Sequence, residues 1–216
     1  MKKTIAVFDI DGTLLKGTSA ERIFVRYLLK RGELHLKDWY NFMRHFLTTF
    51  THNWILATKG NRYYVKGKKR DGVDALAEGC FRTEIVSRVS KIAQSKIEKH
   101  KSDGFEIVLL SGTPDFLLRH FQEYLGADHA HGSMLEILEG RYTGDIIGAF
   151  PYGQAKAEIV LTTYGRDQYD LSASYAYADH VSDFEFLKLF GHPHIVNPNH
   201  RLASKAMRVG IDTFYF

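Results

Sequence analysis

The chain has 216 residues, which fits one sizeable α/β domain or a core carrying a smaller inserted domain, and its 44% hydrophobic content is ample for a packed core. Its 29 basic and 25 acidic residues are scattered and give a net charge of +4, so we expect no nucleic-acid partner. A single cysteine, Cys80, excludes an internal disulfide and favours a cytoplasmic setting. No stretch approaches the ~20 apolar residues of a membrane helix, so we also expect no membrane partner.

The N-terminal segment has the pattern of a buried parallel strand that ends in carboxylates. Residues 5–8 form a continuous apolar run, and Asp9-Ile10-Asp11-Gly12-Thr13 follows directly. In an extended backbone the side chains of Asp9 and Asp11 project to one side, and Gly12 lets the chain turn tightly behind them. Two carboxylates this close seldom both ionise without a nearby cation, so the pattern favours a functional site over a simple turn.

The next segment, residues 17–81, reads as a helical insertion because it contains no strand pattern. Its periodic stretches lie at 21–30, 36–50 and 73–81. The insertion is rich in aromatic residues, which we expect to be mostly engaged in helix packing. After it, residues 84–101 predict one long amphipathic helix with Ile85, Val89, Ile92 and Ile97 on its apolar face.

The remainder of the chain alternates strand and helix patterns. Strands are predicted at 106–110, 173–178 and 195–196, with a helix over 116–124 and a β-hairpin over 135–147 that turns at Gly140. The histidines near residues 129–131 and 192–200 are expected to be loop and core residues. Together these patterns predict an α/β fold, a doubly wound, Rossmann-like parallel sheet. We expect residues 1–16 and 82–216 to form the core domain and 17–81 to form a helical cap.

The strand-end motifs resemble those of a known superfamily. Residues 8–14, Phe-Asp-Ile-Asp-Gly-Thr-Leu, are similar to the first motif of the haloacid dehalogenase superfamily in its phosphatase form. Ser111 resembles the hydroxyl residue of the second motif, Lys156 the lysine of the third, and Asp179 and Asp183 the paired acids of the fourth. The helical insertion between the first two motifs is similar to that of the phosphoserine phosphatase-like subgroup. His180 departs from the subgroup, which commonly has serine or glycine there.

The resemblance implies a role for each motif residue and a Mg²⁺ cofactor. Asp9 would be the nucleophile that forms an aspartyl-phosphate, and Asp11 the general acid and base. Ser111 would donate to a phosphate oxygen together with the backbone N–H of Gly112, and Lys156 would favour the ionised nucleophile. The metal ligands would be the side chains of Asp9 and Asp179 and the carbonyl of Asp11, with Asp183 in the outer shell.

The substrate is expected to be a small phosphorylated metabolite bound partly by the cap. Candidate cap contacts are Thr18, Glu21, Arg44 and Arg62. Phosphoserine phosphatases have a glutamate at the place where this chain has Thr18, which offers no charge for a substrate ammonium. Glu21 is one helical turn further on and could substitute, but we rank an anionic or neutral leaving group first.

Three functional hypotheses are open at this point. The leading one is a phosphomonoester hydrolase, since dehalogenases lack the acid at the Asp11 position and transport ATPases have threonine there. A phosphotransferase or phosphomutase would use the same residues and differ only in water access. A non-catalytic interaction protein is the third, although all the motif side chains are present. Oligomeric state is not indicated.

Overall fold

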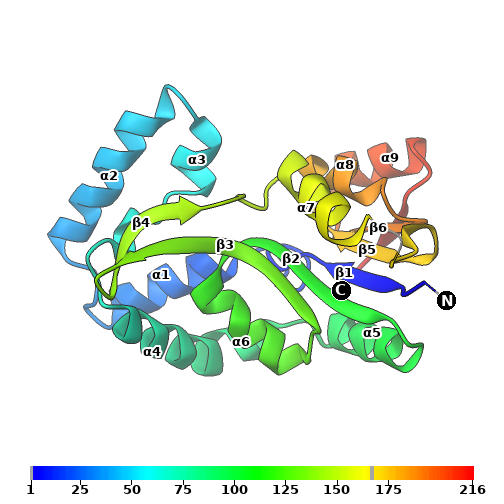
Figure 1. Ribbon diagram of the computed structural model, residues 1–216, viewed down its shortest axis with the longest axis horizontal. Helices are drawn as coiled ribbons and strands as arrows, with labels where there is room; N and C mark the ends of the chain where they lie inside the picture. Colours follow the sequence, from blue (N-terminus) through cyan, green and yellow to red (C-terminus); the bar gives the residue numbers. More distant parts are fainter. Residues whose placement is uncertain (1, 166–167) are drawn as a thin grey trace.

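The computed structural model describes residues 2–165 and 168–216, and its centre is a twisted, mostly parallel sheet (Figure 1). Within the described residues the sheet has seven strands in the order β4-β3-β2-β1-β5-β6-β7. The strands are β1 (Ile5–Phe8), β2 (Glu106–Pro114), β3 (His129–Leu138), β4 (Arg141–Ile147), β5 (Tyr175–Ala178), β6 (His192–Val196) and β7 (Asp212–Phe214). The α/β, doubly wound fold predicted from the sequence is confirmed.

Helices cover both faces of this sheet (Figure 1). The α-helices are α1 (Ala20–Lys30), α2 (Leu36–Phe50), α3 (Trp54–Lys59), α4 (Arg70–Cys80), α5 (Lys91–Ser102), α6 (Asp115–Leu125), α7 (Gln154–Tyr164), α8 (Phe184–Leu187) and α9 (His200–Arg208). Short 3₁₀ turns occupy Tyr63–Val65, Val86–Arg88, Leu171–Ala173 and Val181–Asp183, and a π-helical turn occupies Phe81–Ile85. No helix among the described residues is long and apolar enough to cross a membrane.

Strand order places β1 at the point where the winding of the sheet reverses. β1 pairs in parallel with β2 on one side and with β5 on the other. From β1 the chain builds outward through β2 and β3, and then returns to add β5, β6 and β7 on the opposite side. Open α/β sheets bind ligands at the carboxyl ends of the strands beside such a reversal. Asp9 and Asp179, which follow β1 and β5, therefore lie at the favoured position.

Successive side chains of β1 point to opposite faces of the sheet and pack into two different hydrophobic cores. Ala6 and Phe8 belong to one core, together with residues of α1, α4, α5 and α6. Ile5 and Val7 belong to the other, together with residues of α7, α8 and α9. Because a strand buried on both faces must be apolar at every position, its sequence shows a continuous run instead of an alternation. This double burial holds the carboxyl end of β1 in a fixed position.

The inserted segment between β1 and β2 forms two layers. Phe24 and Leu28 of α1 and Val73 and Ala77 of α4 share the first core with Phe116 of α6, so these helices extend the layer under the sheet. The α2–α3 pair lies on the other side of the sheet from α1 and α4, beside β4 (Figure 1). The domain boundaries at residues 17 and 81 remain a prediction.

One local prediction needs correction. The helix predicted over 84–101 is broken, because Val89 has extended backbone and α5 starts afresh at Lys91, capped by the Ser90 side chain. The restart changes the phase of the helix, so Ile92 is 58% exposed instead of buried. Most aromatic side chains of the insertion are buried or partly buried, as expected, and the exposed ones are Trp39, Tyr40, Phe50 and Trp54.

Candidate active site

The turn after β1 brings two carboxylates to one place. Asp9 is buried and follows the strand directly, and Asp11 accepts a hydrogen bond from the backbone N–H of Ala20, at 2.8 Å, at the start of α1. Gly12 has a φ of 85°, and a Cβ there would overlap the Asp179 carboxylate. Glycine is therefore required twice over, by its backbone conformation and by the close approach of β5.

A buried lysine holds the Asp9 carboxylate. Lys156, in the first turn of α7, donates to Asp9 Oδ1 at 2.8 Å and to Asp183 Oδ2 at 3.3 Å. Burial alone would lower the pKa of the Lys156 ammonium, but the carboxylates of Asp183 and Asp9 raise that pKa above its usual value. The charged form of Lys156 is therefore favoured, and the structure brings the sequence-predicted partners Asp9, Lys156 and Asp183 together.

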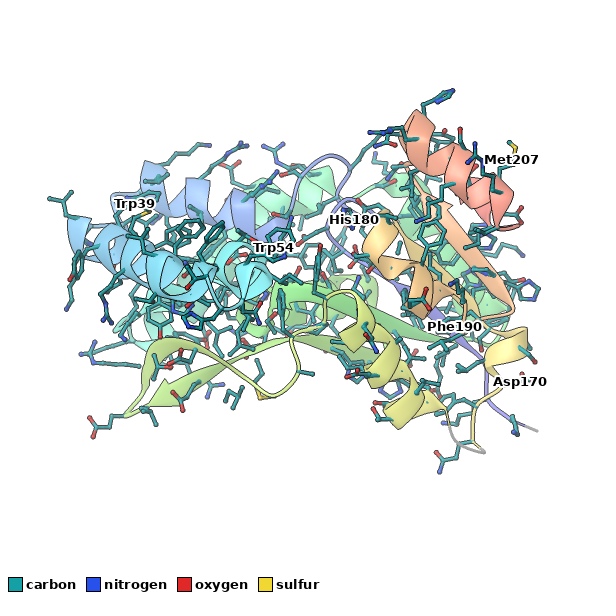
Figure 2. All side chains as sticks on the ribbon, turned by 90° about the horizontal axis from the view of Figure 1, so that it is seen from above. Trp39, Trp54, Asp170, His180, Phe190 and Met207 are labelled. Carbon is teal, nitrogen blue, oxygen red and sulfur yellow. The ribbon has the colours of Figure 1, made fainter. Side chains whose placement is uncertain are left out.

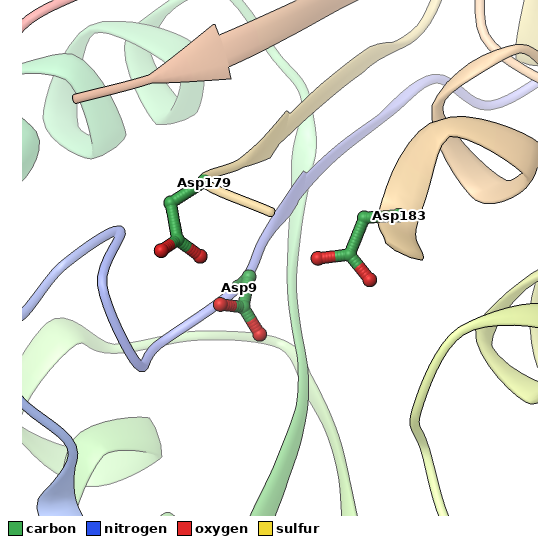
Figure 3. A group of neighbouring side chains, drawn as sticks. All are labelled: Asp9, Asp179 and Asp183. Carbon is green, nitrogen blue, oxygen red and sulfur yellow. The ribbon is translucent and has the colours of Figure 1, made fainter. Parts of the chain in front are cut away.

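Three carboxylates converge on a position suited to a metal ion (Figure 3). Oxygen atoms of Asp9, Asp179 and Asp183 all lie within 4.8 Å of one another, and Asp183 Oδ1 is buried with no hydrogen-bond partner. Burial and the neighbouring charges of Asp9 and Asp183 raise the pKa of Asp179 to about 7. A cation would relieve this repulsion, and an all-oxygen donor set suits a hard divalent ion. These residues therefore fit a metal such as Mg²⁺.

Asp11 has the electrostatic character of an acid–base group. Burial, and next the charge of Asp9, raise the pKa of Asp11 to about 7, although its hydrogen bond from Ala20 works in the opposite direction. Its Oδ2 also accepts a weak hydrogen bond from Thr113 Oγ1 at 3.4 Å. A carboxyl group with this pKa can both release and accept a proton near neutrality.

The end of β2 supplies hydroxyl groups opposite these acids. Ser111 is buried, and its Oγ lies 3.0 Å from Thr113 Oγ1 and accepts from the Thr113 N–H at 3.3 Å. The carbonyl of Gly112 accepts hydrogen bonds from Ser133 Oγ at 2.7 Å and from Arg62 Nη2 at 3.0 Å. The loop is therefore fixed from both sides.

A cleft of about 910 Å³ joins these groups to the inserted helices. Ser111, Gly112, Lys156 and the four acids line it. Of the predicted cap contacts, Thr18, Glu21 and Arg62 line it as well, whereas Arg44 is exposed on α2 and is not a lining residue.

A buried ion pair closes one part of the cleft. Arg62 Nη1 lies 3.0 Å from Glu21 Oε2 and donates to the Lys59 carbonyl at 2.8 Å. Burial raises the pKa of the Glu21 carboxyl, and the Arg62 charge opposes that rise. The pair is only partly satisfied, because Glu21 Oε1 and Arg62 Nε are buried without a hydrogen-bond partner among the described residues.

Two residues that support the site were given no role in the sequence analysis. Thr113 links Ser111 to Asp11 through its hydroxyl, and its place two residues after Ser111 on the same strand was the available signal. Asn197 has a φ of 48°, and its amide donates to the carbonyls of Gly12 and Thr13 at 3.0 and 3.3 Å. Such a long-range contact has no signature in the local sequence.

Comparisons with known proteins agree with this geometry. A family model described as haloacid dehalogenase-like hydrolase matches residues 6–188. Among curated relatives, a histidinol-phosphatase of Neisseria meningitidis is 25% identical over 217 residues, covering 96% of each chain. A phosphoserine phosphatase of Mycobacterium tuberculosis is 28% identical over 211 residues, covering 95% of this chain and 68% of that protein.

Solved structures show the same fold. A protein with unknown function from Bordetella pertussis Tohama I superposes with a TM-score of 0.83 at 21% identity, covering 99% of both chains. A substrate-bound phosphoserine phosphatase superposes with a TM-score of 0.68 at 20% identity, covering 100% of this chain and 93% of that one. The fold, the order of the motif residues and the family match lead to one assignment: the chain belongs to the haloacid dehalogenase-like hydrolase family.

Proposed function

We propose that this phosphoric monoester hydrolase is Mg²⁺-dependent and transfers the phosphoryl group of its substrate to Asp9, forming an aspartyl-phosphate that water then hydrolyses. The observation that carries the proposal is the buried Asp9 carboxylate, which is paired with Lys156 at 2.8 Å and stands two residues before an acid whose pKa is raised to about 7. A phosphatase of this kind needs one ionised carboxylate and one that holds a proton. Burial raises the pKa of Asp9, the Lys156 ammonium opposes that rise, and a bound cation would favour the ionised form of Asp9 further.

Each residue of the site has a chemical task in this mechanism. Asp9 forms a bond to phosphorus while the bond to the leaving oxygen breaks, and Asp11 gives its proton to that oxygen. In the second half Asp11 takes a proton from water as the water attacks the phosphorus and releases Asp9. Ser111 and the backbone N–H groups that follow it bind the phosphoryl oxygens, and the Lys156 ammonium favours the ionised form of Asp9 against the effect of burial.

Carboxylate side chains of the site would bind the metal ion. Asp9 and Asp179 would hold the Mg²⁺ ion, with Asp183 beside them, and the bound ion would supply positive charge against the phosphoryl oxygens. The close approach of the three carboxylates and the partnerless Asp183 oxygen support this assignment.

The inserted helices form the specificity part of the enzyme in this proposal. Residues 17–81 act as the cap, with Thr18, Glu21 and Arg62 near the leaving group. The Arg62 guanidinium at 3.0 Å offsets the negative charge of Glu21, which weakens the attraction of Glu21 for a substrate ammonium even though its Oε1 has no hydrogen-bond partner in the described part of the chain. This pairing supports an anionic or neutral leaving group.

The test is phosphate release from an aryl phosphate by the purified protein, with and without Mg²⁺, for the parent and Asp9→Asn. We expect metal-dependent turnover by the parent, none by the variant, and an acid-stable mass increase on Asp9 in the parent after rapid quenching with acid. Turnover by an Asp9→Asn preparation as pure as that of the parent would refute the assignment of Asp9 as the nucleophile. Circular dichroism of both proteins controls for folding.

A further inference from the structure

Helix α2 carries a row of large apolar side chains on its solvent face. The row is spaced four, three, four and three residues apart, so its members share one face of the helix. All are exposed, with Leu36 at 88% and Leu47 at 66%. The members are Leu36, Tyr40, Met43, Leu47 and Phe50, and Trp54 at the start of α3 is exposed as well. Contiguous exposed apolar surface of this kind indicates a site of interaction.

The charges around this apolar row are positive. Lys37 and Arg44 are exposed on α2 beside it. The acid of the segment 36–60 is Asp38, which is buried on the opposite side and paired with Lys68 at 2.9 Å. A second copy of the chain packed on this face would bring like charges together, whereas anionic headgroups would complement them. Lipid membranes combine such headgroups with an apolar layer beneath.

The aromatic residues fit the same surface. Trp39, Tyr40 and Trp54 are all exposed on the α2–α3 pair, and tryptophan and tyrosine are the residues enriched at the boundary between lipid and water. Figure 2 shows Trp39 and Trp54 on this side of the molecule, far from α9 and its exposed Met207. A helix that lies flat on a membrane has this division into an apolar row and basic flanks.

The row continues into the catalytic cleft. Trp39 is 42% exposed next to the row and also lines the cleft, where its ring meets that of Phe42 edge-on with centroids 6.3 Å apart. Val25 and Leu34 line the cleft as well. An apolar path therefore runs from the surface of α2 into the cleft that contains Asp9. The volume of about 910 Å³ exceeds what a phosphoryl group and a few further atoms would fill.

We propose that the α2–α3 face docks on an anionic lipid bilayer and that the cleft takes from it a phosphomonoester with a long apolar leaving group. The docking stands on the surface of α2 alone, whereas the choice of substrate rests on the proposed function. The phosphoryl group would reach Asp9 while the apolar chain lies along Trp39 and Phe42. Docking of this kind is peripheral and needs no membrane-spanning helix.

Docking is tested by sedimentation of the full chain with phosphatidylcholine vesicles that contain or lack phosphatidylglycerol. We expect binding to the anionic vesicles, weakened at least about tenfold by Leu36→Gln combined with Leu47→Gln, because two large apolar side chains no longer enter the lipid. Lys37→Gln with Arg44→Gln should weaken it by a similar factor and remove most of its salt dependence. Met207→Gln, an equally exposed change on α9, is the matched control and should bind like the parent.

Three results would overturn the docking proposal. The first is no binding to anionic vesicles, and the second is binding that the α2 variants leave unchanged. The third is a dimer in light scattering that dissociates in the Leu36 and Leu47 variant, which would make a second copy the occupant. Hydrolysis of a soluble aryl phosphate by that same variant should equal the parent's, which separates loss of docking from loss of folding.

The substrate class is tested with two esters that differ only in chain length. We expect kcat/KM for monomeric dodecyl phosphate to exceed that for ethyl phosphate by at least about tenfold, and Trp39→Ser to reduce this preference. Equal values for the two esters would refute the apolar path, whether or not the vesicles bind. Failure with every ester, the aryl phosphate included, would instead refute the proposed function.

Discussion

Replacement of Arg62 by methionine should destabilise the protein and disturb the phosphate-binding loop together. The guanidinium is buried, and it connects three segments by contacting Glu21 of α1, the Lys59 carbonyl at the end of α3 and the Gly112 carbonyl near the end of β2. The variant removes this donor from one carboxylate and two carbonyl oxygens, of which the Gly112 carbonyl keeps its hydrogen bond from Ser133. Its effects should therefore exceed those of an ordinary surface change.

The magnitude follows from these contacts. Removing one partner of a buried ion pair costs about 3–5 kcal/mol, because the remaining charge is left desolvated. For a chain of this size that corresponds to a fall in Tm of about 10 °C. Burial already raises the pKa of Glu21 and Arg62 opposes the rise, so loss of Arg62 raises it further. The folded variant then retains a proton that the unfolded chain releases, and its deficit in stability grows as the pH rises above about 4.5.

The assay is urea unfolding of the parent, Arg62→Met, Glu21→Gln and the double variant, at about pH 5 and about pH 8. At the higher pH we expect the free energy of unfolding of the double variant to exceed, by ~2 kcal/mol, the value obtained by adding the losses of the two single variants. The reason is that the double variant leaves no unpaired charge. Arg62→Lys serves as the conservative variant if the methionine form does not fold. Additive losses that do not change with pH would refute the reasoning.

Three further changes test other parts of the structure. Asp11→Asn should slow turnover of the aryl phosphate by ~10²-fold or more while the protein stays folded, as measured by phosphate release and circular dichroism. Gly12→Ala should lower stability by ~1–2 kcal/mol, because the backbone at this position has a φ of 85°. The new Cβ should also displace the Asp179 carboxylate, so the Mg²⁺ concentration needed for half-maximal activity should rise. Burial lowers the pKa of His100 to about 4, so the unfolded chain takes up a proton that the folded protein does not, and stability should fall as the pH falls from about 6.5. This residue should contribute up to ~3 kcal/mol to that loss. Acid unfolding of His100→Gln should show a smaller loss of stability than that of the parent.

The sequence predicted those parts of the fold that local patterns determine. The apolar runs of β1 and β2 can be recognised in the sequence because both strands are buried on both faces. Each run also ends in polar residues, which mark the end of the strand. Gly140 turns the hairpin between β3 and β4 at a φ of 72°, as expected from the glycine between two apolar runs. Parallel strands then bring their ends together, which is why residues as distant as Asp9 and Asp179 could be placed at one site.

Features set by long-range packing could not be predicted. The break before α5 depends on Ser90, whose side chain caps the new helix while its N–H donates to the Leu14 carbonyl. Arg44 and Arg62 were equal candidates in the sequence, yet one lies on the solvent face of α2 and the other is buried beside Gly112. The periodicity of α2 likewise shows that it has an apolar face but not whether another element covers it.

The packing of the insertion limits how the cleft can open. Because α1 and α4 share a continuous core with α6, a rigid movement of the whole segment 17–81 would expose that core to water. Arg62 adds a polar restraint at the base of the cleft through its bond to the Gly112 carbonyl. The helices α2 and α3 lie on the other side of the sheet and, among the described residues, contribute no buried residue to that core. The exposed apolar row that we propose for docking therefore belongs to the part of the insertion that is held least by this core.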